Sequence, residues 1–208
     1  KTEVLGGKPF FPALNHLNLF NTNSERVFGY APDRIVTCGR GLKKVFSAYD
    51  KEGYYEMGAS FRYSYLNKLV DKNYINSSER NRHSVVSIIL PQSINISKYV
   101  LTLSKKAVQN AIAHGWNFRV KTHPSLTKSD VTTLLKEYDM KNECLKETQE
   151  SMESLLPRTS VIVTSASSTA IEAICLGIPV VAVGMPIDLD FNMLDYLPSS
   201  MWKIAFTD

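Results

Sequence analysis

Three short apolar runs constrain what this chain of 208 residues can fold into. They are VVSIIL at 85–90, SVIVT at 160–164 and IPVVAV at 178–183. Each run is rich in β-branched residues, and none alternates with polar residues as a strand with one solvated face would. Continuous apolar strands of this kind are typical of parallel sheets that have helices on both faces. The sequence therefore predicts an α/β domain.

Helical patterns separate these strands along the chain. Apolar residues recur at helical spacing over 96–113, and further helices are expected over 129–138, 152–156 and 169–176, with a strand at 118–121. Gly115 and Gly177 follow two of these segments as helix stops. Right-handed crossovers then predict a doubly wound parallel sheet, Rossmann-like in arrangement. The loops after 90, 121, 164 and 183 should share the edge where such sheets bind ligands.

A polar stretch at 73–83 (NYINSSERNRH) divides the chain into regions of different character. Residues 1–80 are interpreted as the remnant of a preceding domain with a linker, and residues 81–208 as the parallel-sheet domain. The first region is less regular, with strands expected at 35–37 and 55–58 and a helix at 41–49. Because the chain begins with Lys1 rather than Met, we expect it to be a fragment of a longer protein.

Composition excludes several classes of function. A net charge of +4, with 24 Lys and Arg against 20 Asp and Glu, suits anionic ligands or peripheral contact with an anionic membrane, but no basic block indicates nucleic acid. Three cysteines without a CxxC pair favour a reduced, cytoplasmic setting. No apolar run reaches the roughly 20 residues of a membrane span. The P-loop, GxGxxG, GxSxG and HExxH signatures are all missing, which argues against a P-loop ATPase, a dinucleotide enzyme, a serine hydrolase and a zinc enzyme. No metal or bound cofactor is expected.

A cluster of hydroxyl side chains stands between the strand at 160–164 and the helix at 169–176. Residues 165–169 read SASST, with four hydroxyls in five positions. Ser167 or Ser168 can serve as an N-cap, since a hydroxyl there accepts from the free amides of the first turn. The same amides and the helix dipole also form an anion site that suits phosphate, with Thr169 beside it. Both interpretations fit the sequence.

Glu172 lies one helical turn after this cluster, three residues beyond Thr169. As the N3 residue of a capping box, its carboxylate would reach back to the cap. Alternatively, the carboxylate would accept hydrogen bonds from ribose hydroxyls while the helix start holds a phosphate.

His123 and Pro124 follow the strand at 118–121 and should lie at the same edge as the hydroxyl cluster. Pro124 disfavours the helical conformation at His123 and could aim the imidazole outward. The imidazole could then donate to a phosphate or protonate a leaving group, or it could be an ordinary surface histidine. Three further candidates for nucleotide or phosphate contacts are Lys121 at the end of the strand at 118–121, Pro124, and Gln92 in the loop after residue 90.

These elements together resemble the nucleotide-binding half of GT-B-fold glycosyltransferases. The resemblance rests on KTHP at 121–124, SSTAIEA at 167–173 and GIPV at 177–180. A histidine-proline motif followed by paired serines is similar to bacterial sialyltransferases, Kdo transferases and CDP-glycerol polymerases. In those families, the two motifs hold the phosphate of a cytidine nucleotide. The stretches PDRIV at 32–36 and GASFRYSYL at 58–66 resemble the linker that precedes this domain.

The resemblance implies a glycosyltransferase of surface polysaccharide biosynthesis. Its donor would be a nucleotide-sugar, with a CMP-linked sugar favoured, and its acceptor a saccharide or a lipid-linked saccharide. Residues 1–80 would then belong to the acceptor domain, which usually supplies the catalytic base. His123 would act on the departing phosphate without a metal, at the cytoplasmic face of the inner membrane. A nucleotide-sugar 2-epimerase of the same fold and a non-catalytic nucleotide-sugar-binding module are the alternatives.

Overall fold

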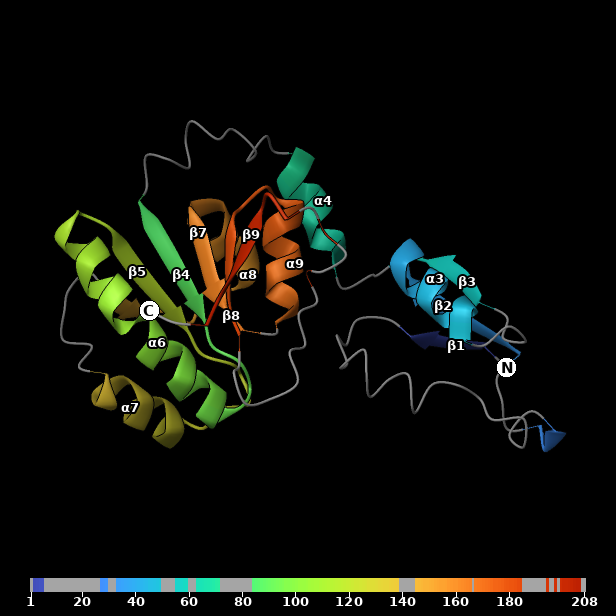
Figure 1. The fold of residues 1–208 in the computed structure, drawn as a ribbon, viewed down its shortest axis with the longest axis horizontal. Coiled ribbons are helices and arrows are strands. Elements are labelled where there is room, and N and C mark those ends of the chain that lie inside the picture. The colour runs from blue at the N-terminus through green and yellow to red at the C-terminus, as the bar shows by residue number, and fades with distance from the viewer. Residues whose placement is uncertain are drawn as a thin grey trace. The chain divides into compact units, whose positions relative to one another are not determined.

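The computed structural model describes residues 2–5, 27–29, 33–49, 55–59, 63–71, 84–138, 145–165, 167–184, 194, 197 and 199–206. These residues form two compact units, one within Lys1–Tyr65 and one within Leu66–Asp208 (Figure 1). The polar stretch at 73–83 lies outside the described residues. The predicted domain boundary between residues 80 and 81 falls there too and stays a prediction.

The first unit contains a small parallel sheet in the order β1-β2-β3. Its elements are β1 (Thr2–Leu5), β2 (Arg34–Cys38), α3 (Gly39–Tyr49) and β3 (Tyr55–Gly58). The predicted strands at 35–37 and 55–58 and the helix at 41–49 are confirmed, while β1 was not predicted. The unit has a buried cluster of Ile35, Phe46 and Tyr55. The rings of Phe46 and Tyr55 stack in it, with 5.5 Å between their centroids. Helix α3 is thereby held against the sheet.

The second unit follows the predicted alternation of strands and helices. Its elements are α4 (Ser64–Asp71, which begins just before the division), β4 (Val85–Ile89), α6 (Ile94–Ala113), β5 (Asn117–Lys121), α7 (Lys128–Glu137), β6 (Leu145–Glu147), α8 (Met152–Leu155), η2 (Leu156–Arg158), β7 (Val161–Thr164), α9 (Ser168–Cys175), β8 (Val180–Val183) and β9 (Trp202–Ala205). All predicted helices and strands after residue 84 are present within a few residues. The short strands β6 and β9 and helix α4 were not predicted.

All six strands of this unit are parallel and run in the order β6-β5-β4-β7-β8-β9. Within this unit, the chain enters the sheet at the central strand β4 and adds β5 and β6 on one side. It then crosses to the other side of β4 and adds β7, β8 and β9. This is the Rossmann strand order 3-2-1-4-5-6. The predicted α/β doubly wound parallel sheet is therefore confirmed, and its switch point lies between β4 and β7.

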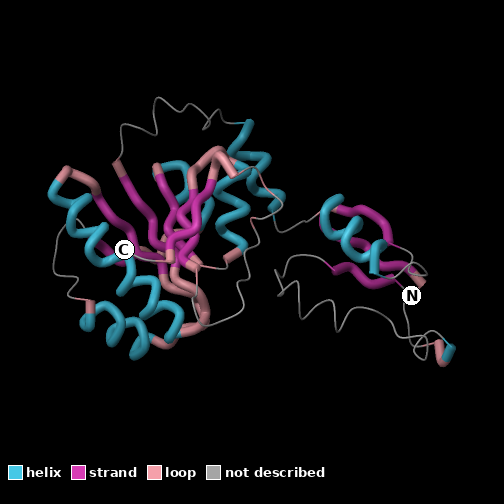
Figure 2. Tube along the Cα trace, viewed as in Figure 1, coloured by secondary structure: helices cyan, strands magenta, loops and turns pink. Residues whose placement is uncertain are grey.

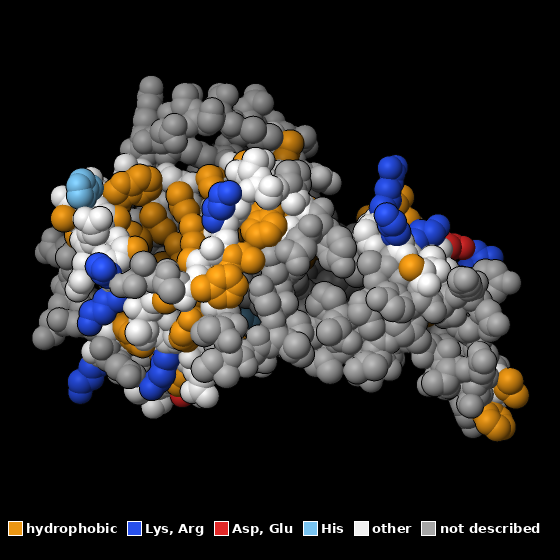
Figure 3. Space-filling model, in the orientation of Figure 1, with side chains coloured by type: hydrophobic (Ala, Val, Ile, Leu, Met, Phe, Trp, Pro, Cys, Tyr) orange, Lys and Arg blue, Asp and Glu red, His pale blue; other side chains and the backbone are white. Residues whose placement is uncertain are grey.

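Helices cover both faces of the sheet, as the tube view shows (Figure 2). On one face, Val86, Ile88 and Leu90 of β4 and the following loop pack in one cluster with residues of α6 and α7. The space-filling view shows Lys and Arg side chains over these two helices, beside apolar side chains that lie open over the strands (Figure 3). Because side chains along a strand point alternately to the two faces of the sheet and β4 is packed on both, every residue from Val86 to Leu90 is buried.

Glycines end two helices as predicted. Gly177 has φ of 69° and Gly115 has φ of 84°, the left-handed conformation that glycine adopts most easily. After α9, the amide of Gly177 donates to Ile174 and that of Ile178 donates to Ala173. These two bonds form a Schellman motif, which turns the chain directly into β8.

Candidate functional site

The carboxyl ends of β5, β4 and β7 lie in register. Ile89 of β4 is paired with Lys121 of β5 on one side and with Thr164 of β7 on the other. The Thr164 hydroxyl donates to the Ile89 carbonyl at 2.8 Å, which ties the two strands together at this edge. Since neighbouring strands are about 4.8 Å apart, the ends of β5 and β7 are separated by roughly 10 Å. The segments after both strands, which carry His123 and the hydroxyl cluster, therefore lie on either side of β4 at the edge that contains the switch point.

Helix α9 begins inside the hydroxyl cluster. Ser167 is its N-cap, and the Ser167 hydroxyl accepts a hydrogen bond from the Thr169 amide at 3.3 Å. The N3 position is consequently Ala170, whose amide donates to the Ser167 carbonyl. Glu172 lies two residues further along, so the capping-box interpretation of Glu172 is wrong. The cap function falls to Ser167 alone.

The other three hydroxyls of the cluster are buried and have no hydrogen-bond partner among the residues that the structure describes. Ser165, Ser168 and Thr169 are 5%, 6% and 7% exposed. Within the described part of the chain, their hydroxyl groups form no hydrogen bond. A buried hydroxyl that lacks a hydrogen bond costs about 1–3 kcal/mol, and most native proteins avoid it. An anion with several oxygens, bound at the positive end of this helix, is one partner that can satisfy such groups.

Thr122 is a further buried hydroxyl that the sequence interpretation missed. It follows β5 directly, as Ser165 follows β7, and Leu90 stands between them at the end of β4. Thr122 is 6% exposed, and its hydroxyl has no hydrogen-bond partner among the residues that the structure describes. The signal was present in the KTHP motif, because a residue that follows a buried strand of a doubly wound sheet lies at the ligand edge. Its burial depends on the sheet register, which the motif alone does not contain.

Glu172 is buried on α9, with 3% of its surface exposed. Its carboxylate lies close enough to Cys175 to act on the thiol. Partial desolvation raises the pKa of Cys175, an otherwise exposed residue, and the negative charge of Glu172 raises that pKa further. A charged group at this depth is rare unless it serves a specific contact.

His123 begins a tight turn after β5. The Leu126 amide donates to the His123 carbonyl at 3.0 Å, with Pro124 in the second position of the turn. Proline is favoured there because its fixed φ matches the turn geometry. Ser125 contacts the imidazole, with 2.7 Å between its hydroxyl oxygen and Nδ1. Pro124 therefore shapes the turn that holds His123, and its assignment as a nucleotide contact stays a prediction.

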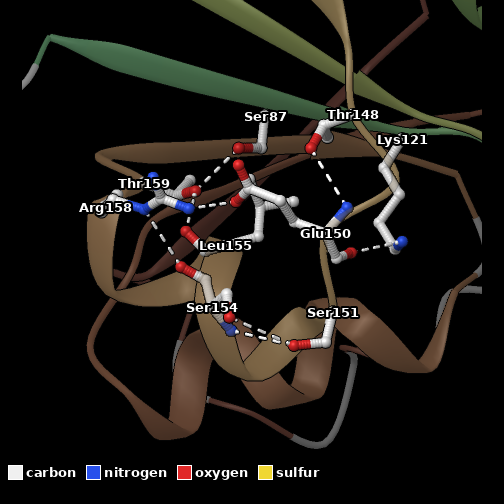
Figure 4. A network of polar contacts seen from close by, with 9 residues as sticks. All are labelled: Ser87, Lys121, Thr148, Glu150, Ser151, Ser154, Leu155, Arg158 and Thr159. Atoms are coloured by element: carbon white, nitrogen blue, oxygen red, sulfur yellow. Dashed lines mark hydrogen bonds and ion pairs between the residues drawn. The ribbon is translucent and has the colours of Figure 1, made fainter.

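Lys121 is bonded on the β6 side of the sheet. Its ammonium donates to the Glu150 carbonyl at 2.6 Å, in the loop that leads from β6 to α8 (Figure 4). Arg158 pairs with the Glu150 carboxylate and also donates to the Ser154 carbonyl. These contacts tie the connection between β6 and β7 to the end of β5. They give the Lys121 ammonium a structural partner, so we do not assign it a contact with the donor phosphate.

Gln92 lies in the exposed loop between β4 and α6, at the switch point itself. Its position agrees with the expected edge, and its contact with a nucleotide stays a prediction. In the described ranges, no group of three or more His, Cys, Asp or Glu side chains has the arrangement of a metal site. None of the described helices combines the length and apolar character needed to cross a bilayer.

Comparisons with known proteins show distant structural similarity. The beta Kdo 2,7 transferase KpsC of Thermosulfurimonas dismutans aligns with 99% of this chain and 83% of its own, at 13% identity and a TM-score of 0.36. The beta Kdo 2,4 transferase KpsC of that organism aligns with 99% of this chain and 84% of its own, at 13% identity and a TM-score of 0.38. MurG of Acinetobacter baumannii aligns over 88% of this chain and 61% of its own, at 12% identity and a TM-score of 0.41. No family model and no curated protein matches the chain. At these values, the similarities assign neither family nor function.

Proposed function

We propose that this chain is the donor-binding part of a GT-B glycosyltransferase that acts on a nucleotide-sugar. The observation that carries the proposal is the group of buried hydroxyls of Ser165, Ser168 and Thr169 near the N-terminus of α9, for which the described residues offer no hydrogen-bond partner. They lie beside the switch point of a Rossmann-ordered sheet, where nucleotides commonly bind. The resemblance of the KTHP and SSTAIEA motifs to transferases of this fold supports the same conclusion.

Each part of the site has a chemical role in this proposal. Hydroxyls at the start of α9 and its free amides hold the donor phosphate, and Glu172 accepts hydrogen bonds from the nucleoside. During transfer, the bond between the sugar and the phosphate oxygen breaks, and its electron pair stays on the phosphate. His123 donates a hydrogen bond or a proton to that oxygen. Donors aimed at developing charge lower barriers by about 2.7–4 kcal/mol in well-studied sites.

The oxygen of the acceptor hydroxyl forms the new bond to the anomeric carbon of the sugar. Its proton passes to a base that is none of the site residues named above. We propose a saccharide or lipid-linked saccharide as the acceptor, and a CMP-linked sugar as the favoured donor. The reaction is proposed to need no metal, and we place it in the cytoplasm, peripheral to the inner membrane. Chelation with EDTA tests the metal independence, since activity should persist.

A panel of nucleotides tests donor binding. CMP, CDP, UDP, GDP and dTDP are each added at increasing concentration while thermal unfolding is followed. A ligand at 100 times its Kd adds about 2.7 kcal/mol to the free energy of unfolding, which gives a clear rise in Tm. A rise with CMP supports the proposal, and a rise with another nucleotide corrects the donor. No rise with any nucleotide contradicts the proposal.

Turnover separates the transferase from the two alternatives. With a bound nucleotide-sugar and a saccharide acceptor, a transferase releases the free nucleotide and a glycosylated product. An epimerase would return an altered sugar that is still attached to the nucleotide, and a binding module would return the donor unchanged. The last two results would each overturn the proposed reaction.

A further inference from the structure

Two contacts hold the imidazole of His123 at one nitrogen. The Ser125 amide donates to Nδ1 at 3.2 Å, and the Ser125 hydroxyl oxygen lies 2.7 Å from the same nitrogen. A backbone N–H can only donate, so Nδ1 must present its lone pair. In the neutral ring, the proton then resides on Nε2. The turn that begins at His123 brings the Ser125 amide within hydrogen-bond distance of Nδ1.

His114 shows the opposite arrangement in the same protein. Its Nδ1 lies 2.8 Å from the Asn110 carbonyl oxygen at the end of α6. A carbonyl oxygen can only accept, so the neutral His114 ring carries its proton on Nδ1. The two described histidines therefore have opposite tautomers, and each serves as the internal reference for the other.

We propose that Ser125 is a positioning residue that holds His123 with its lone pair at Nδ1 and its N–H at Nε2. The Nε2–H group is then the donor that the turn presents to a phosphate at the carboxyl edge of the sheet. The functional meaning of this arrangement rests on the proposed function, whereas the position of the proton does not. Histidine-proline-serine is thus one unit, in which Pro124 shapes the turn and Ser125 orients the ring.

Nitrogen NMR of the ligand-free protein tests the proton position directly. In ¹⁵N-labelled protein at a pH where both rings are neutral, Nδ1 of His123 should resonate as an unprotonated ring nitrogen and Nε2 as a protonated one. His114 should show the reverse pattern. A protonated Nδ1 at His123, or averaged shifts at both of its nitrogens, overturns the proposal whatever the protein binds.

Variants of Ser125 test the functional consequence with CMP as the probe. Ser125→Ala removes the hydroxyl but keeps the amide, so CMP affinity should fall roughly 2- to 10-fold, as for loss of one net hydrogen bond. Ser125→Thr retains both the hydroxyl and the amide, so it should keep the affinity and the ¹⁵N pattern of the parent protein. His123→Ala serves as the second background of a double-mutant cycle.

The cycle distinguishes positioning from direct contact. If Ser125 acts through His123, adding Ser125→Ala to His123→Ala should leave CMP affinity unchanged. An equal loss in both backgrounds means that Ser125 touches the ligand itself, which overturns its positioning role. If CMP binds neither to the parent protein nor to any variant, the proposed function fails. The ¹⁵N pattern then decides the tautomer by itself.

Discussion

Replacing Ser168 by alanine distinguishes a ligand contact from a structural contact by the sign of its effect on stability. Ser168 is 6% exposed, and no hydrogen-bond partner for its hydroxyl exists among the described residues. A buried unsatisfied hydroxyl destabilises a fold by about 1–3 kcal/mol. Ser168→Ala removes this hydroxyl and changes the side chain by only one oxygen atom. We therefore expect the free energy of unfolding of the ligand-free protein to stay the same or rise by about 1 kcal/mol.

Ser167→Ala should have the opposite effect on stability. The Ser167 hydroxyl caps α9 by accepting from the Thr169 amide at 3.3 Å. Loss of an N-cap costs about 0.5–2 kcal/mol, and this long bond favours the lower half of that range. Neighbouring serines in one sequence motif are thus predicted to separate into a cap, whose loss destabilises the helix, and a ligand contact, whose loss does not.

Ligand binding completes the test. A hydrogen bond to a charged phosphate contributes about 1.5–3 kcal/mol, so Ser168→Ala should weaken nucleotide binding roughly 10- to 150-fold. Urea unfolding gives the stability and calorimetry gives the affinity. Ser104→Ala is the matched control, because the Ser104 hydroxyl donates to the Val100 carbonyl within α6 at 2.7 Å. If Ser168→Ala destabilises the protein as Ser167→Ala does and leaves binding unchanged, the phosphate-site reasoning is refuted.

Three further predictions concern charged groups. Lys121→Met should lower the free energy of unfolding by about 1 kcal/mol, because the contact with the Glu150 carbonyl is lost, and should change nucleotide affinity less than about twofold; a large loss of affinity at unchanged stability would return Lys121 to the phosphate site. Hydrogen bonds from the side chain and amide of Thr127 lower the pKa of Asp130, so this carboxylate stabilises the fold above its ordinary pKa, and the effect is lost as the pH falls through the lower, folded value. Carbon NMR titration should show the pKa of Asp130 rising toward its ordinary value in Thr127→Ala, and an unchanged pKa would exclude this cause. Glu172→Gln should lower the pKa of Cys175 and speed its alkylation by iodoacetamide at a fixed, mildly alkaline pH, whereas an unchanged rate would mean that the charge of Glu172 does not reach the thiol.

Central strands were predictable from sequence because they are buried on both faces. The run VVSIIL contains enough apolar residues to identify β4 without any tertiary knowledge. Outer strands β6 and β9 read LKE and WKIA, which are short and partly polar, and each is paired with β5 or β8 on one side. Each of these edge segments is too short and carries too few apolar residues for the sequence pattern to identify it as a strand.

Site residues were predictable where the chemistry is local. Ser167 as a possible cap follows from its place before a helical pattern. The turn at His123 was not predicted, although proline is common in the second position of such a turn. Lys121 could not be placed in the same way, since its partner Glu150 is 29 residues away. The burial of Thr122 likewise depends on the pairing of β5 with β4 and β6. Such contacts arise from the sheet register rather than from any motif.

A crystal structure with bound CMP tests the central claim most directly, namely that the buried hydroxyls at the start of α9 hold a nucleotide phosphate. We predict phosphate oxygens within hydrogen-bond distance, about 2.5–3.2 Å, of the hydroxyls of Ser168 and Thr169 and of Nε2 of His123. A phosphate bound elsewhere on the chain, with these hydroxyls still lacking a ligand contact, would contradict the claim.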